Sequence, residues 1–504
     1  MRRNSMRRVM LVLALLVTLE WHTSSSAAEN DALAEEIAKI VSEPRCAKMR
    51  LGLRVETLSS QPTVIYERNS HDLFKPASNQ KLVTTAAALR LLPPDFGYRT
   101  ILAIRGQDLV VIGDGDPSLG DPRVAKLTDD PIDAVFLDWA EKLKRSGITR
   151  ISGDLIFDDF IFDQVFVHPS WRGKFNLQAG YTAPVGGLNF NNNCIGVVVK
   201  PASTLNQLAQ VSLVPPCLGV KLDNKTVTAR KGEPAVKRTD NGGMSITVSG
   251  SVSRANNAAN PLNVAVSDPG AFFAGALRAA LADEGIQIAG QTRRQRITAP
   301  GFKLPPDVKI VAAHESKLAD ILWRINKSSV NMSAEALLKT LGARPGPGLP
   351  IQQGSLKTAR EAVVGFLHTL SLPSDLYFID DGSGLSHENR LSPVVLTTIL
   401  QYMDRHPQRE VWWANLATPG EKDSTLIHRM KDLNDSVRAK TGHIAGVSAL
   451  SGYVLGPGNR RYAFSILCND TYKAKGGPSS ADRLEESICR LLANWEPTTS
   501  TKAK

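Results

Sequence analysis

The chain is 504 residues long, with 42% hydrophobic residues, 22% charged residues and a net charge of +11 at neutral pH. This length exceeds what a single hydrophobic core usually organises, so we expect two or three domains. The basic excess is spread along the chain rather than gathered in one run. That distribution excludes a dedicated nucleic-acid-binding arm and indicates a mostly solvated charged surface.

The N-terminus has the layout of a secretory signal. It begins MRRNSMRR, continues with an apolar run over residues 9–19, and reaches small residues that end at Ala28. This layout predicts a signal peptide of residues 1–28. The apolar run is too short to span a bilayer, which takes about 20 residues, and no other segment approaches that length. We therefore expect an exported protein without a transmembrane anchor, which favours an anionic envelope polymer over nucleic acid as its partner.

The sequence that follows the predicted signal peptide indicates a helix, two strands and a second helix. Residues 31–41 show an amphipathic helical pattern, and strand-like stretches follow at 51–58 and 63–68. An apolar stretch over residues 82–92 then predicts a buried helix.

The middle of the chain has a different texture. Residues 93–306 contain strand-like runs with many Asn, Gly and Pro turns, and two predicted helices over 133–145 and 271–284. Breaks near Gly180 and Pro261 indicate a smaller β-rich piece nested inside a larger one.

The last third of the chain returns to a mixture of helices and strands. Helical patterns cover residues 316–341 and 358–370, with a Gly/Pro-rich loop between them. Residues 436–455 and 460–469 alternate as antiparallel strands around a Gly-Pro-Gly-Asn turn, and a helix follows over 481–495. Strands from both ends of the chain can therefore share one sheet, with the terminal helices packed together.

All five cysteines follow the predicted cleavage site, where oxidising conditions permit disulfides. Their odd number leaves at least one without a partner in the chain. Cys194 and Cys217 flank a possible hairpin, so they are the pair that we expect to be joined. Neither the cysteines nor the nine histidines show a metal-ligand spacing, so we expect no metal and no cofactor.

Ser78 and Lys81 stand at the start of the predicted helix and form the only Ser-x-x-Lys pair in the sequence. Positions three apart share a helix face, so the Lys81 amine can approach the Ser78 hydroxyl. A buried amine near other cations loses its proton more readily and can then take the proton of a serine. Alone the pair is weak evidence, because a serine that merely caps a helix is the commoner arrangement.

Two later motifs change that balance. Ser-Val-Asn at residues 329–331 interrupts a helical pattern, and Lys-Thr-Gly at residues 440–442 is followed by strand-like residues. A helix start, a helix break and an edge strand are the local structures that an active site with a serine nucleophile and a lysine base requires. Ser78 and Ser329 must meet in one site although about half the chain separates them. A large insert between them must therefore leave their own domain intact.

The order of the three motifs resembles the signature set of penicillin-binding proteins and class A β-lactamases. The predicted leader, the long insert and the sequence DGSGLS at residues 381–386 extend the resemblance. Together they resemble the class C low-molecular-mass penicillin-binding proteins, the D-alanyl-D-alanine carboxypeptidase/endopeptidase family. Class A β-lactamases are disfavoured because their first two motifs lie far closer together.

The resemblance implies an α/β (α+β) fold: a serine transpeptidase/β-lactamase-like domain with an antiparallel sheet flanked by helices. Residues 29–92 and 307–504 would form this catalytic domain. Two nested β-rich accessory domains would be inserted between the first two motifs. The outer one would comprise residues 93–180 and 261–306, and the inner one residues 181–260.

The resemblance also implies an activity and a compartment. The protein would be a periplasmic serine DD-peptidase that removes terminal D-alanine from peptidoglycan stem peptides or cleaves their crosslinks through an acyl-enzyme on Ser78. β-Lactam antibiotics would trap the same serine. The balance between the two reactions and the oligomeric state stay open at this point.

Four residues are expected to carry the catalysis. Ser78 would attack the carbonyl carbon, with Lys81 as its base. Ser329, bridging Lys81 and Lys440, would relay a proton to the leaving amine. Asn331 would orient Lys81 and the substrate amide, because its side chain both donates and accepts.

Five further residues are expected to bind substrate. Lys440 would supply positive charge, and the Thr441 hydroxyl would bind a terminal carboxylate. Gly442 would leave room for a substrate backbone along the strand edge, and the N–H of His443 would join that of Ser78 around the oxyanion. Tyr181 would touch the substrate side chain by resemblance, although a buried structural tyrosine is an equal alternative.

Three other interpretations compete. Gly382-Ser383-Gly384 looks like a nucleophile loop, but it lacks the G-x-S-x-G spacing, so we interpret it as a structural turn near the site. The same acylation chemistry would serve an esterase or a β-lactamase. A non-catalytic peptidoglycan-binding protein would need no proton relay, so the intact motifs argue against it.

Overall fold

The computed structural model describes residues 28–240, 243–254, 261–433, 435–471 and 479–496. The predicted signal peptide, residues 1–28, lies outside these ranges except for Ala28. Within them, no helix is both long enough and apolar enough to cross a membrane.

A five-stranded antiparallel sheet combines strands from both ends of the chain, as the sequence predicts. Its order is β19-β20-β21-β1-β2, so the N-terminal β1 lies between β2 and the last strand of the chain. β20 and β21 are buried on both faces, in keeping with their mostly apolar sequences. The strands are β1 (Arg50–Thr57), β2 (Val64–Arg68), β19 (Val437–Ile444), β20 (Val447–Leu455) and β21 (Arg461–Asn469).

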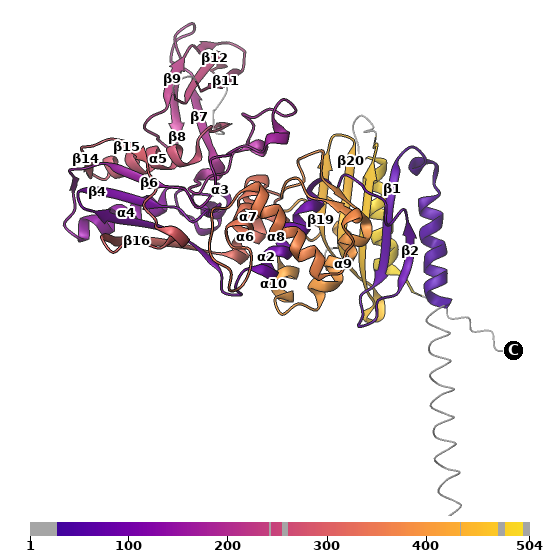
Figure 1. Ribbon diagram of the computed structural model, residues 1–504. Helices are drawn as coiled ribbons and strands as arrows, with labels where there is room; N and C mark the ends of the chain where they lie inside the picture. Colours follow the sequence, from indigo (N-terminus) through magenta and orange to yellow (C-terminus); the bar gives the residue numbers. More distant parts are fainter. Residues whose placement is uncertain (1–27, 241–242, 255–260, 434, 472–478, 497–504) are drawn as a thin grey trace, which may run out of the picture.

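Helices cover both faces of this sheet, and alternate strand residues enter the two cores (Figure 1). Leu450 of β20 packs with the helix over residues 28–41 and with α11, whereas Ala449 packs with α2 and its neighbours. This layering confirms the predicted α/β class. The helices are α2 (Gln80–Leu91), α6 (Leu318–Asn326), α7 (Asn331–Ala343), α8 (Leu356–Thr369), α9 (Pro393–Asp404), α10 (Arg409–Ala414) and α11 (Ser480–Asn494).

The predicted helix over 316–341 is broken where the Ser-Val-Asn motif interrupts its pattern. α6 ends at Asn326 and α7 starts at Asn331. Ser329, between them, has φ of 60°, in the left-handed region that a non-glycine residue rarely adopts. The N–H of Val330 donates to the carbonyl of Arg324 at 3.1 Å, which turns the chain back onto the end of α6. Such strain at a tight turn is typical of functional sites.

A second sheet, of order β15-β6-β4-β3-β16, lies in the middle of the chain. The helices α4 (Ala134–Arg145) and α5 (Pro269–Asp283) share its core through Phe136, Trp139 and Phe273. β3 pairs with β16 so that Gly97 lies opposite Lys317, and the chain therefore leaves and re-enters the first unit at neighbouring points. The strands are β3 (Gly97–Arg105), β4 (Asp108–Ile112), β6 (Leu155–Asp158), β15 (Thr292–Arg294) and β16 (Val308–Lys317).

The pairing of β16 with β3 extends the second sheet beyond the predicted boundary at residue 306. The turn-rich composition that marks the insert ends before residue 306, so composition alone does not assign β16 to it. The division into three domains itself remains a prediction.

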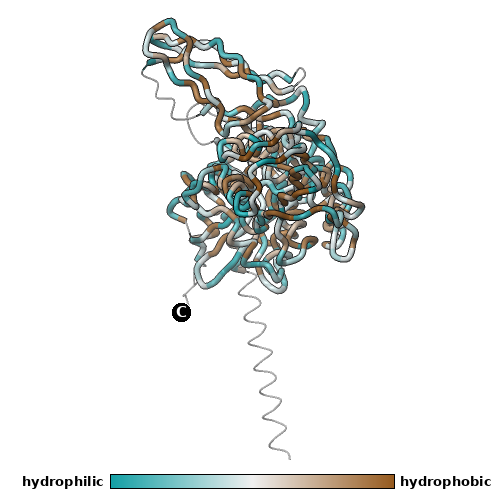
Figure 2. Tube along the Cα trace, turned by 90° about the vertical axis from the view of Figure 1, so that its left-hand side faces the viewer, coloured by the Kyte–Doolittle hydropathy of each residue, from teal (hydrophilic) through white to brown (hydrophobic). Residues whose placement is uncertain are grey.

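A smaller group of strands projects from the second unit (Figure 1). Figure 2 shows the same lobe at the top, with hydrophilic and hydrophobic segments interspersed along its strands. Alternating burial along β8 and β11 matches strands with one covered face. The strands are β7 (Cys194–Lys200), β8 (Gln210–Val214), β9 (Lys221–Asn224), β10 (Val227–Ala229), β11 (Pro234–Thr239), β12 (Ser245–Ser253) and β13 (Leu262–Ala265).

The expected disulfide between Cys194 and Cys217 is wrong, although the hairpin that suggested it is present. β7 and β8 pair as antiparallel strands, with Gly196 opposite Val214. Beyond β8 the chain carries Cys217 to α5, where its thiol lies 3.7 Å from the carbonyl oxygen of Phe272. All five cysteines, each within the described residues, are free thiols.

The remaining short elements connect these units. They are α3 (Pro122–Thr128), β5 (Arg150–Ile151), β14 (Gln287–Ile288), β17 (Tyr377–Phe378) and β18 (Arg390–Leu391).

Candidate active site

The Ser78 turn lies between the sheet and the buried helix α2. A short 3-10 turn over Ala77–Asn79 leads into α2, and Ser78 is partly exposed there. Ala77 has φ of 46°, so the residue before the serine is strained. A Cβ on Gly384, which has φ of 82°, would lie 1.7 Å from the Ala77 carbonyl oxygen. Gly384 is therefore required for close contact with the Ser78 turn.

Lys81 is completely buried one turn after Ser78, as the helix spacing predicts. Its Nζ lies 3.0 Å from Ser78 Oγ, 2.7 Å from Asn331 Oδ1 and 2.7 Å from the carbonyl oxygen of Ser383. Burial lowers the pKa of the Lys81 amine to about 7, against the opposing effect of the Asp381 and Glu335 carboxyls. A substantial fraction of this amine is therefore neutral at neutral pH and can accept a proton.

Lys440 provides a second buried amine, on β19. Its Nζ donates to Ser329 Oγ at 3.0 Å and to the Thr441 carbonyl at 2.9 Å. Burial and the nearby charge of Lys81 hold the pKa of Lys440 well below its usual range. Within the described residues, Ser329 hydrogen-bonds to Lys440 but not to Lys81, so the expected bridge between the two amines is only half formed.

The strand β19 lies at one edge of the five-stranded sheet. Ala439 exchanges both backbone hydrogen bonds with Ala417 at that edge. Because backbone groups alternate in direction along an antiparallel strand, Thr441 and His443 direct their N–H and C=O groups toward the same edge. The Thr441 hydroxyl donates to Thr425 Oγ1 at 2.7 Å, a contact that the sequence motifs do not reveal.

Gly442 lies where β19 meets the turn that carries Ser78. A Cβ at this position would lie 2.9 Å from the Pro76 carbonyl oxygen and 3.1 Å from Ala77 Cβ. The missing side chain therefore lets β19 pack directly on the turn that carries Ser78. Asn79 strengthens the same contact, because its Nδ2 donates to the Lys440 carbonyl at 2.9 Å.

Tyr181 lies beside the motif residues and is not a buried structural tyrosine, since 49% of it is exposed. Its carbonyl oxygen accepts a hydrogen bond of 2.9 Å from Asn331 Nδ2. It also lines a cavity of about 320 Å³ with Ser329, Asn331 and Met332.

The DGSGLS segment is a structural turn near the site, as expected, and it also supplies a group that the sequence analysis missed. The Ser383 carbonyl contacts Lys81, and the carboxyl of Glu335 binds the backbone N–H groups of Gly382 and Ser383. The signal available in the sequence was the position of DGSGLS among the motifs, but a backbone carbonyl leaves no mark on residue types.

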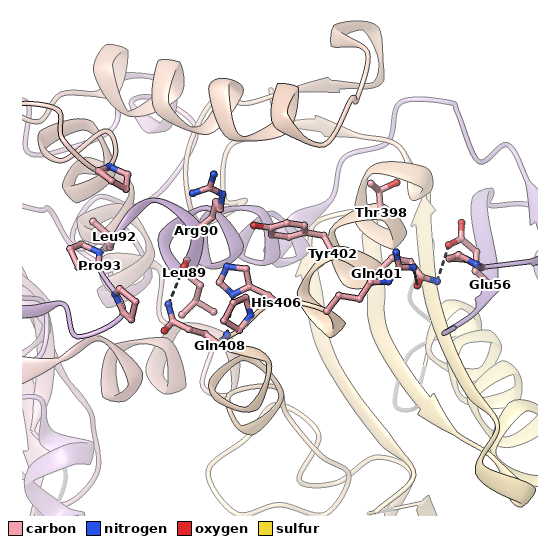
Figure 3. Close-up of a pocket in the computed structure, with 15 residues that line it drawn as sticks. Glu56, Leu89, Arg90, Leu92, Pro93, Thr398, Gln401, Tyr402, His406 and Gln408 are labelled. Atoms are coloured by element: carbon pink, nitrogen blue, oxygen red, sulfur yellow. Dashed lines mark hydrogen bonds between the residues drawn. The ribbon is translucent and has the colours of Figure 1, made fainter. Parts of the chain in front are cut away.

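A cavity of about 830 Å³ lies at the opposite end of α2, between Leu89, Pro93, Tyr402 and His406 (Figure 3). It shares no residue with the motifs. Within the described residues, no group of three or more His, Cys, Asp or Glu side chains is arranged to hold a metal ion.

Taken together, the site defines a class of protein. A serine at the start of a helix, a buried amine of lowered pKa beside it and an edge strand are the parts of an acyl-transferring serine hydrolase. The three motifs meet although about half the chain separates the first from the second.

Comparisons with known proteins agree with this class. The D-Ala-D-Ala carboxypeptidase 3 (S13) family matches residues 33–488. A D-alanyl-D-alanine carboxypeptidase of Actinomadura sp. (strain R39) is 30% identical over 494 residues, covering 94% of this chain and 86% of the relative. The chain therefore belongs to the D-Ala-D-Ala carboxypeptidase 3 (S13) family, and it is a serine-type D-Ala-D-Ala carboxypeptidase.

Solved structures show the same fold. Penicillin binding protein 4 from Haemophilus influenzae superposes with a TM-score of 0.72 at 21% identity, covering 91% of this chain and 99% of the other. The same protein complexed with a β-lactam superposes with a TM-score of 0.65 at 20% identity, covering 92% and 99%.

The packing of Gly442 generates a prediction. In Gly442→Ala, the added methyl group pushes β19 away from the Ser78 turn, and kcat/KM for D-alanine release falls about 100-fold because the site is misplaced. Gly365→Ala is the matched control, since a Cβ at Gly365 on the helix α8 meets nothing within 4 Å. Equal kcat/KM for the Gly442→Ala variant and the unmodified protein would contradict this role.

Proposed function

We propose that this DD-peptidase is exported and acts on peptidoglycan stem peptides through an acyl-enzyme on Ser78. The observation that carries the proposal is the contact of 3.0 Å between the Ser78 hydroxyl and a buried lysine amine whose pKa is lowered to about 7. The predicted signal peptide over residues 1–28 supports export to the periplasm, where the substrate lies.

In the first step, neutral Lys81 takes the proton of the Ser78 hydroxyl as Ser78 Oγ attacks the carbonyl carbon of the penultimate D-alanine. The backbone N–H groups of Ser78 and His443 stabilise the negative charge that develops on the carbonyl oxygen. The direction of alternate backbone groups along β19 supports the role of His443.

The attack produces a tetrahedral intermediate. When this intermediate collapses, the peptide bond breaks and Ser78 is left acylated. The departing amine needs a proton, and the pair Ser329 and Lys440 is suited to deliver it because their side chains already share a hydrogen bond of 3.0 Å. Water then attacks the ester and releases the shortened peptide. The substrate's terminal carboxylate would bind near Lys440 and the Thr441 hydroxyl. The side chain of the substrate would lie beside Tyr181.

The same site would accept β-lactams, because a strained cyclic amide presents its carbonyl to Ser78 in the same way. The complex of the Haemophilus influenzae penicillin binding protein 4 with a β-lactam supports this ligand class. Whether terminal D-alanine or a crosslink is the preferred substrate depends on the chain that leaves, so we propose both reactions for the same acyl-enzyme.

Acylation of Ser78 gives the most direct test. Fluorescent penicillin should label the purified protein, and Ser78→Ala should abolish both labelling and D-alanine release from peptidoglycan fragments. Ser383→Ala is the matched control, because it removes the hydroxyl of another serine of the site but keeps the backbone carbonyl that contacts Lys81. Labelling of the Ser78→Ala variant would contradict the assignment of Ser78 as the nucleophile.

The lowered pKa of Lys81 predicts a pH dependence. Only the neutral amine can take the proton of Ser78, so the acylation rate should rise with pH through about 7 and level off above it. The rate constant for labelling by fluorescent penicillin, measured from pH 5 to pH 9, tests this expectation. A rate that keeps rising toward the ordinary lysine pKa of about 10.4 contradicts a neutral Lys81 at working pH.

A further inference from the structure

To act as a base, the Lys81 amine must be neutral, and its lone pair must face the Ser78 hydroxyl. The oxygens of Asn331 and Ser383 that lie 2.7 Å from its Nζ both belong to carbonyl groups, which can only accept. A neutral amine has two N–H donors and one lone pair. When both donors are used by these two carbonyls, the lone pair is left facing Ser78, the third neighbour at 3.0 Å. The Ser383 carbonyl therefore helps to determine where the lone pair of Lys81 points.

The Ser383 carbonyl belongs to a segment whose backbone is held by two buried carboxyls. Glu335 Oε1 accepts from the N–H of Gly382 at 3.0 Å and from that of Ser383 at 2.7 Å. Asp381 Oδ1 accepts from the N–H of Gly384 at 2.7 Å. Three successive N–H groups are therefore bound by acidic side chains, while the Ser383 carbonyl points to Lys81.

Glu335 comes from the same helix as Asn331 and lies four residues later, so both are on one face of α7. This face provides one acceptor of the Lys81 amine and the carboxyl that holds the segment of the other acceptor. Asn331 contacts the amine directly, whereas Glu335 acts through the backbone of Gly382 and Ser383.

We infer that Glu335 is a positioning residue of the acylation step. By binding the N–H groups of Gly382 and Ser383 it fixes the Ser383 carbonyl as the second acceptor of Lys81 and so directs the amine's lone pair at Ser78. The inference rests on the proposed roles of Ser78 and Lys81.

The charges around Glu335 fit this role. Burial and the neighbouring Asp381 raise the pKa of Glu335 to about 8, so its carboxyl is largely protonated at neutral pH. The other charged groups facing it are Lys81 and Lys339, and Lys339 is paired with Asp163 at 2.7 Å. Within the described residues, Glu335 Oε2 has no hydrogen-bond partner. A neutral acid that accepts through one oxygen is closely imitated by glutamine.

The test compares two substitutions in the full-length protein by the rate constant of labelling with fluorescent penicillin as a function of pH. Glu335→Gln keeps the accepting oxygen, so its plateau rate should stay within about threefold of the original. Glu335→Leu releases the Ser383 carbonyl, and its plateau rate should fall about 100-fold.

The midpoint of the pH profile separates positioning from simple damage. In Glu335→Leu the Lys81 ammonium loses an acceptor that stabilises its charge, so the midpoint should move to lower pH. Damage that only reduces the amount of folded enzyme would lower the amplitude of labelling and leave both the plateau rate constant and the midpoint in place. Equal plateau and midpoint in Glu335→Leu and the unmodified protein would overturn the inference, and so would an equal loss in Glu335→Gln.

A second pair of variants decides the case if Glu335→Leu does not fold. Thr84 Oγ1 donates to the Gly382 carbonyl at 2.8 Å, so Thr84→Val loosens the same segment and should lower the plateau about tenfold. Thr85→Val is the matched control, because the Thr85 hydroxyl donates within α2, to the Lys81 carbonyl at 2.7 Å.

Identical rates for the two threonine variants would also overturn the positioning role. Failure of the proposed function shows itself differently, as labelling of Ser78→Ala. If Ser78→Ala is unlabelled while every variant of the supporting residues acylates normally, only the inference about Glu335 is lost.

Discussion

The burial of one amine, that of Lys81, is the constraint on which the rest of the structure depends. Removing a lysine from water favours its neutral form, and here this effect lowers the pKa to about 7 in spite of two nearby carboxyls. A buried amine is tolerated only when its remaining hydrogen-bonding capacity is satisfied. Ser78, Asn331 and Ser383 supply that satisfaction, and each comes from a different segment of the chain.

The need to bring these segments together explains the architecture. α2 lies between the helices of one layer and the sheet, so it meets α7 on one side and β19 through the Ser78 turn. The long insert leaves this arrangement intact because its first and last strands, β3 and β16, pair with each other. Tight glycine contacts at Gly384 and Gly442 then bring the DGSGLS segment and the edge strand against the serine.

The sequence could predict what depends on local pattern. Periodicity located α2, α4, α5, α8, α11 and the terminal strands, but not α9 or α10. The three motifs singled out Ser78, Lys81, Ser329, Asn331 and Lys440. Contacts between distant segments were harder. Hydrophobic alternation does not show that Cys217 turns toward α5, nor that Gly442 packs against the carbonyl oxygen of Pro76. The roles of the Ser383 carbonyl and of Glu335 depend on backbone geometry that residue types alone do not encode.

The most direct measurement is the titration of Lys81 itself. NMR of the protein labelled with ¹³C at lysine Cε, with the resonance assigned by a Lys81→Arg variant, would follow its protonation with pH. The account predicts a midpoint close to 7 for this one lysine. A midpoint near the ordinary lysine value of about 10.4 would contradict it, because the amine would then be charged at working pH and unable to activate Ser78.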